Sequence, residues 1–172
     1  MPMKVLVTYW SQTGNTKRVA EAVFEALPGE KTILPMDQVT SADGFDLILA
    51  GFPVMQFGPS AFAGEFIRRH TAGRKTALFV THAMPVHSDD PRQQALLEKV
   101  LSRCRAAASA SEMVGFFHCQ GELSEKTASG LMESDIPELR RFASMRPLTL
   151  GHPGREALEQ AGLFGRAMAA SL

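Results

Sequence analysis

The sequence of 172 residues has little cysteine and no excess of charge of either sign. Its two cysteines, Cys104 and Cys119, form no CxxC motif, which fits a reducing cytoplasm better than a disulfide-bonded secreted domain. The 18 basic and 18 acidic residues balance, so neither a nucleic-acid surface nor a basic membrane-binding helix is indicated. No apolar run approaches the ~20 residues of a membrane-spanning helix, and the N-terminus lacks the features of a signal peptide. We therefore expect one cytoplasmic domain over residues 1–172, with no nucleic-acid and no membrane partner.

Short apolar runs alternate along the chain with segments of helical periodicity. Strands are predicted at residues 5–9, 31–35, 45–51, 76–81 and 113–119, and helices at 16–27, 61–70, 91–110 and 154–170. This alternation predicts a three-layer α/β fold, a doubly wound five-stranded parallel sheet with helices on both faces. Five strands fit the order 2-1-3-4-5, in which ligands bind beyond the carboxyl ends of the strands, where the winding reverses.

A run of small polar residues, SQTGNT, follows the first predicted strand and opens the first helix. The first amides of a helix lack internal partners and carry partial positive charge. Hydroxyls and amides gathered there can bind a phosphate without lysine or arginine. One such residue would already cap the helix, so the run favours a phosphate site over a plain cap. The predicted phosphate-binding residues are Ser11, Gln12, Thr13, Gly14, Asn15 and Thr16.

Competing motifs are absent from the sequence. There is no GxxxxGK[ST], no GxGxxG after a strand, and no GxSxG, which argues against P-loop, dinucleotide-binding and α/β-hydrolase proteins. A receiver domain needs an acidic residue where Gly51 stands. His82, His87, Asp89 and Asp90 lie close together in the sequence but match no zinc pattern, so we predict no metal site.

The stretch VTYWSQTGNTKRVAEAV resembles the first strand, phosphate loop and first helix of the flavodoxin family, and DGFDLILAGFPV resembles its third strand. VGFFHCQGELS and HPGREALEQAGLFGRAM resemble the late strand and closing helix of a flavodoxin-like subgroup distinct from the short electron carriers. The resemblance covers essentially the whole chain. It implies a flavodoxin-like fold that holds FMN non-covalently, with the FMN phosphate on residues 11–16.

The resemblance also implies that the flavin ring lies between the loops after the third and fourth strands. Where many members carry Trp or Tyr after the proline, this chain has Met55 and Gln56, so Met55 or Phe57 would pack on the ring. Phe52 fits the core equally well. The predicted ring-contacting residues are Phe52, Pro53, Val54, Met55, Phe57, Gly58, Thr81, His82 and Ala83.

Other residues near this edge have two interpretations each. Gly58 would let a carbonyl turn toward the ring because glycine tolerates positive φ. His82 would raise the flavin potential when protonated and donate a proton, or simply be hydrogen-bonded in its loop. Trp10 would cover the ribityl chain or pack on the surface. For Cys119 a buried small hydrophobe is favoured over a redox-active thiol, and His118 is interpreted as structural.

Three functions follow from these residues. The first is an electron carrier between redox partner proteins, which the neutral charge weakens because family carriers tend to be acidic. The second is an FMN-dependent NAD(P)H:quinone-type reductase of a small-molecule acceptor, with its pocket at the interface of a homodimer. The third is a flavin-free binding scaffold, which the intact residues 11–16 argue against. No catalytic side chain is assigned, since the flavin carries the chemistry.

Overall fold

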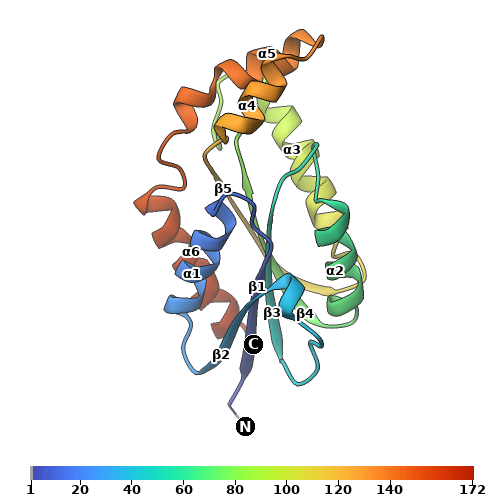
Figure 1. Ribbon diagram of the computed structural model, residues 1–172. Helices are drawn as coiled ribbons and strands as arrows, with labels where there is room; N and C mark the ends of the chain where they lie inside the picture. The colour runs from blue at the N-terminus through green and yellow to red at the C-terminus, as the bar shows by residue number, and fades with distance from the viewer. Residues whose placement is uncertain (1) are drawn as a thin grey trace.

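The computed structural model describes residues 2–172 as a parallel sheet with helices on both faces (Figure 1). The sheet has five strands in the order β2-β1-β3-β4-β5, which confirms the predicted class and order. The strands are β1 Lys4–Tyr9, β2 Glu30–Pro35, β3 Leu47–Pro53, β4 Lys75–His82 and β5 Glu112–Gln120. The longer helices are α1 Asn15–Ala26, α2 Ala61–Thr71, α3 Pro91–Ala106 and α6 Arg155–Ala170.

Two apolar cores lie on opposite faces of the sheet. On one face, Val5 and Val7 of β1 pack with Val19 and Val23 of α1 and with Ala161 of α6. On the other, Leu6, Leu78 and Val80 pack with residues of α2 and α3. Because successive side chains of a strand point to opposite faces, the continuous apolar runs of the central strands supply both cores at once.

The segment between β5 and α6 is the part that the sequence described least well. It contains the short helices α4 Glu125–Met132 and α5 Pro137–Ser144, followed by the 3₁₀ helix η2 Arg146–Thr149. A second 3₁₀ helix, η1 Met36–Gln38, follows β2 elsewhere in the chain. A small core of Leu123, Ala128 and Ala143 joins α4 and α5 and receives Ala83 from the loop after β4. In Figure 1 these helices lie at the top, toward which the strands point. They therefore border the edge where the sequence predicts a ligand.

The ends of the helices differ from the predicted limits by a few residues. Helix α3 ends at Ala106, before the predicted residue 110, because a series of turns follows in which the amide of Ala108 donates to the carbonyl of Arg105. Among residues 2–172, no helix combines the length and apolarity that crossing a membrane requires.

A glycine in β3 is required by the packing of a neighbouring ring. Gly51 pairs across the sheet with Phe79 of β4, and a Cβ on Gly51 would overlap the Phe79 ring. We predict that Gly51→Ala lowers the free energy of unfolding by about 1–3 kcal/mol, the usual cost of overpacking. Urea unfolding followed by circular dichroism measures the change.

Gly130 on α4 is the matched control, because a Cβ there would meet no atom within 4 Å. Gly130→Ala should raise the free energy of unfolding by roughly 0.5–1 kcal/mol, since glycine is a poor helix former. A neutral Gly51→Ala variant would contradict the packing described for β3.

Candidate functional site

The predicted site residues gather at the carboxyl edge of the sheet. The loop after β1 meets the loops after β3 and β4 there, because parallel strands all end at the same edge. The connection from β5 to α4 joins them, since the Gly121 amide donates to the carbonyl of His82 over 2.7 Å. Four loops thus line one edge.

The loop before α1 leaves the N-terminus of the helix open. Gly14 takes a left-handed conformation with φ of 96° and caps the helix without any side-chain hydrogen bond. The first helical bond runs from the Arg18 amide to the Gly14 carbonyl, at 3.0 Å, so the amides of Asn15 and Lys17 precede it and have no partner within the helix. No acidic residue stands in the first turn. An anion is therefore favoured at this end.

The polar side chains of this loop divide into two groups. Ser11 accepts a hydrogen bond from the Gly14 amide at 3.1 Å, which keeps the loop tight and leaves its own O–H to donate. Gln12 and Thr13 are exposed. These three side chains, with the first amides of α1, offer a phosphate-sized anion several donors from one direction.

Thr16 points away from this loop, into the protein. It is 1% exposed, and its hydroxyl shares a 2.8 Å hydrogen bond with the hydroxyl of Thr81 on β4. Thr81 is 2% exposed. The structure places these two hydroxyls, both of residues predicted to bind the cofactor, against each other, where they fasten the start of α1 to the end of β4. The Thr16 side chain is therefore occupied. What Thr16 can offer a ligand is its backbone amide, which lies in the first turn of α1.

Asn15 fastens the same turn to the connection that follows β5. Its Nδ2 donates to the Glu122 carbonyl at 2.9 Å, and a Cβ on Gly121 would lie 2.7 Å from that Nδ2. Gly121 therefore allows the close approach. The side chain of Asn15 is occupied by this contact, which leaves its amide for a ligand.

The loop after β3 contains a tight turn with an unusual backbone. Met55 and Gly58 exchange two backbone hydrogen bonds, of 2.7 and 3.2 Å, around Gln56 at φ 49° and Phe57 at φ 68°. Two positive φ values define the turn type that normally takes Asn-Gly, so non-glycine residues here are strained. Gly58 itself has no positive φ, so the expected flexible position falls at Gln56 and Phe57 instead. The Phe57 side chain is 43% exposed.

The remaining residues after β3 are placed closer to the core. Phe52 is completely buried among the side chains on the α2 and α3 face, because parity along β3 points it into the core. This agrees with the core alternative that the sequence left open for this residue. Val54 is partly buried against the same core, and its amide donates to the Thr81 carbonyl at 2.8 Å. Pro53 ends the strand opposite Thr81. The exposed part of this loop is therefore residues 56–57.

The loop after β4 begins with a buried histidine. His82 is 5% exposed, and its Nε2 lies 3.0 Å from Nδ1 of His118 on β5 in a hydrogen bond. Its Nδ1 has no partner among residues 2–172. Burial, with His118 as a second cause, lowers the pKa of His82 to about 4. Burial likewise lowers the pKa of His118. The carbonyl of Ala83, next in the loop, accepts from Gln120 Nε2 at 3.2 Å.

The remaining candidates are placed in the core or beside it. Trp10 packs against Phe62 of α2, with ring centroids 6.4 Å apart, and joins the core on that face. Burial raises the pKa of both Cys104 and Cys119 to about 12, which keeps these thiols protonated and unreactive at neutral pH. Residues 2–172 contain no group of three or more histidine, cysteine or acidic side chains able to hold a metal ion.

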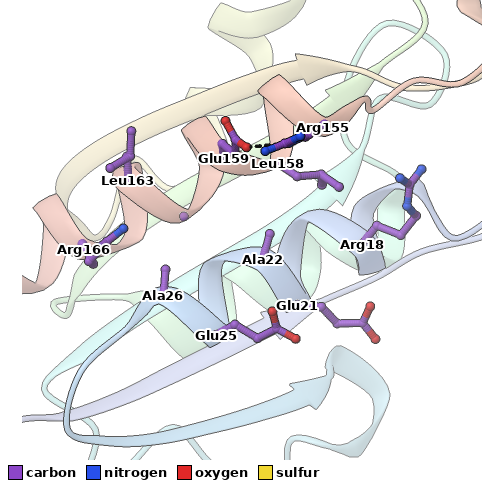
Figure 2. A pocket seen from close by; sticks show the side chains of 11 residues that line it. Arg18, Glu21, Ala22, Glu25, Ala26, Arg155, Leu158, Glu159, Leu163 and Arg166 are labelled. Atoms are coloured by element: carbon purple, nitrogen blue, oxygen red, sulfur yellow. Dashed lines mark hydrogen bonds and ion pairs between the residues drawn. The ribbon is translucent and has the colours of Figure 1, made fainter.

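One hollow lies away from this edge, between α1 and α6. The groove is open and has a volume of about 910 Å³. Figure 2 shows its lining, with Arg155 paired to Glu159 on α6 and acidic side chains on α1. Gly162 lets α6 approach α1, since a Cβ there would lie 3.1 Å from the Cβ of Ala26. None of the predicted site residues lines the groove. We place the functional site at the sheet edge, where the free amides lie, and not in this groove.

Sequence reasoning missed the contributions of β5 and its connection. Gly121 and Glu122 hold Asn15, and His118 pairs with His82, whereas the sequence indicated a structural role for His118 alone. The alternation of β5 was the available signal, since it places His118 on the same face as Phe116 and next to β4. A backbone contact such as that of Glu122 leaves no signal in residue type.

The chain belongs to the flavodoxin family, because the family model described as flavodoxin domain matches residues 6–146. Over 96% of each chain it is 25% identical to the flavodoxin-like domain-containing protein BilS of Clostridioides difficile. Its fold is similar to a flavodoxin from the domain Archaea, with a TM-score of 0.57, 15% identity and 98% of each chain covered. It is also similar to general stress protein 14 of Treponema denticola, solved in complex with FMN, with a TM-score of 0.51, 12% identity and 99% of each chain covered. The structural likenesses show the fold.

The Thr16–Thr81 hydrogen bond predicts a non-additive pair of substitutions. Thr81→Val leaves the buried Thr16 hydroxyl without a partner and should lower the free energy of unfolding by about 1–3 kcal/mol. The double variant Thr16→Val with Thr81→Val removes both polar groups and should cost clearly less than the sum of the single changes. Urea unfolding of the four proteins measures this. Additive single and double variants would mean that the hydroxyls do not interact.

The buried histidine predicts a pH dependence of stability. Since the pKa of His82 is about 4 in the folded protein and 6.5 as the ordinary value, the unfolded chain binds more protons between these pH values. The free energy of unfolding should therefore be intact above pH 6.5 and fall as the pH drops, by about 2 kcal/mol between pH 7 and pH 5. His82→Gln should remove most of this fall in urea unfolding. The exposed His87, changed to Gln, is the control that should keep the wild-type slope.

Proposed function

We propose that this protein binds FMN non-covalently and transfers electrons through it. The observation that carries the proposal is the open N-terminus of α1 beside Ser11 and Thr13, in a chain of the flavodoxin family. A phosphate dianion is a ligand that free amides and hydroxyls at a helix N-terminus bind well. The FMN complex of general stress protein 14 supports the choice of nucleotide.

Each loop of the edge has a separate part in this proposal. Ser11, Gln12 and Thr13 would donate to the phosphate through side chains, and Asn15 and Thr16 through their amides. Two contacts fix these amides before any ligand binds: the Asn15 side chain on Glu122, and the Thr16 hydroxyl on Thr81. Such prior ordering reduces the entropy lost on binding. When bound, FMN supplies one- and two-electron redox chemistry.

The turn at residues 55–58 supports a ring site between the loops after β3 and β4. Strained backbone concentrates at ligand-binding positions, and the strain here holds the Phe57 ring 43% exposed. An exposed aromatic ring at this place offers a stacking face to the flavin. Residues 81–83 would form the opposite wall, with backbone rather than the buried side chains of Thr81 and His82 facing the cofactor.

An electron carrier is the form of the function that we favour. Large apolar side chains are exposed on elements that border the edge: Phe57 in the loop after β3, Phe62 at the start of α2, Ile136 before α5 and Leu148 in η2. Exposed apolar groups of this kind suit a transient docking surface for a redox partner protein. The net charge of zero implies that such docking relies on apolar contact and little on electrostatic steering.

The proposal predicts tight FMN binding that depends on the loop hydroxyls. The purified protein should be yellow, and the apoprotein should quench the fluorescence of added FMN. Ser11→Ala and Thr13→Ala should each weaken binding about tenfold, because each removes a hydrogen bond to a charged group. Ser102→Ala on the exposed face of α3 is the control and should leave the Kd unchanged.

Absence of quenching in the wild-type apoprotein would refute the proposal and leave the scaffold interpretation. Rapid oxidation of NADH or NADPH with a quinone as acceptor would instead identify a reductase. Reduction by a partner protein without such turnover would support the carrier.

A further inference from the structure

Two histidines form a hydrogen-bonded pair near the carboxyl ends of β4 and β5, next to the loop after β4 that forms one wall of the proposed ring site. His82 ends β4, and His118 lies beside it on β5, opposite Val80. The Nε2–Nδ1 distance is 3.0 Å and the ring centroids are 5.2 Å apart. One ring donates and the other accepts, so the two imidazoles form one unit with a single shared proton between them.

The two ends of this pair have different surroundings. The inner end, Nδ1 of His82, is buried and forms no hydrogen bond of ordinary geometry among the residues that the structure describes, while a backbone hydrogen bond with Met84 acts to raise the pKa of His82. A buried polar atom without a partner is rare and calls for an explanation. The outer end belongs to His118, which is only partly buried. The pair therefore connects the outside of the sheet beneath α3 with the loop of residues 81–83.

The charges that face the pair are mostly positive. Arg105 and Glu98 of α3 and His87 of the loop after β4 act on His118, and only Glu98 favours its protonation. His118 is the charged neighbour that acts on His82. With burial, this arrangement keeps both rings neutral at neutral pH. A new negative charge next to His82 would reverse the balance, since an opposite charge within about 4–6 Å favours the protonated form.

We propose that His82 and His118 are a proton-binding site coupled to the charge of the cofactor, an inference that rests on the FMN site proposed above. When negative charge increases on the FMN ring, one proton from water adds to the free Nε2 of His118. The shared proton then moves from Nδ1 of His118 to Nε2 of His82, so His82, whose Nδ1 carries a proton throughout, becomes the positively charged ring. When the negative charge leaves, the proton returns to water by the reverse route. No electron passes through the pair.

The experiment counts protons during reduction of the FMN-loaded protein. Dithionite supplies the electrons, and a pH-indicator dye at about pH 7 reports proton uptake after correction for the reductant. The wild type should take up about one proton more per FMN reduced than His82→Gln or His118→Gln does, because the pair contributes one site. His70→Gln is the matched control: it lies on α2 near Arg74, at the other end of β4, and should match the wild type.

A second measurement needs no substitution and so does not depend on how the variants fold. Nitrogen-15 NMR of the histidine rings in the wild type should show both rings of the pair neutral with oxidised FMN and one proton added after reduction. Equal proton counts in wild type and variants, or rings that stay neutral on reduction, would overturn the inference while FMN binding stands. Failure of the apoprotein to bind FMN would overturn both proposals.

Discussion

The free amides at the start of α1 are the constraint on which the edge of the sheet depends. Gly14 caps the helix without a side chain, and no acidic residue balances the first turn. The partial positive charge of the helix end therefore stays available to an anion. A cation in the loop would bind phosphate as well, but it would add a full charge beside a redox centre. Neutral donors hold the phosphate without that charge.

Two contacts keep this helix end in place, and both reach across the sheet. The Thr16 hydroxyl pairs with Thr81 on β4 inside the protein, and Asn15 donates to the Glu122 carbonyl beyond β5. Each contact uses a side chain that seemed from the sequence to be a ligand. Their role is to position backbone amides, so the loop's side-chain donors are fewer than its composition suggests. Thr81 lies on β4, whose following loop is one of the two ring loops, so its contact with Thr16 links the two halves of the site.

The fold could be predicted from the sequence because its signals are local and repeated. Apolar runs give the strands, helical periodicity gives the helices, and the right-handed crossover limits the order of the strands. The phosphate loop could be located because its residues are contiguous. The ring loops could not be assigned residue by residue: Phe52 and Phe57 have the same side chain, and only the parity of β3 and the turn at residues 55–58 separate a core ring from an exposed one. The pairing of His118 with His82 depends on the register of β4 and β5, which no local pattern specifies.

The neutrality of the site explains why a buried histidine pair belongs beneath it. A phosphate held by neutral donors keeps its own charge, and the chain carries no net charge to offset it. The cations in the first turn of α1 are Lys17 and Arg18, and their side chains are exposed to water. They would compensate little for additional electrons on a ring at the same edge. Burial favours the neutral form of the His82–His118 pair, and Nδ1 of His82, at the end of β4, forms no hydrogen bond of ordinary geometry among the residues that the structure describes. The pair can supply positive charge only when negative charge is present, whereas a permanent lysine at this place would favour the reduced cofactor at all times. A protonatable pair thus couples the charge of the cofactor to pH, and it does not favour the reduced cofactor permanently as a lysine would.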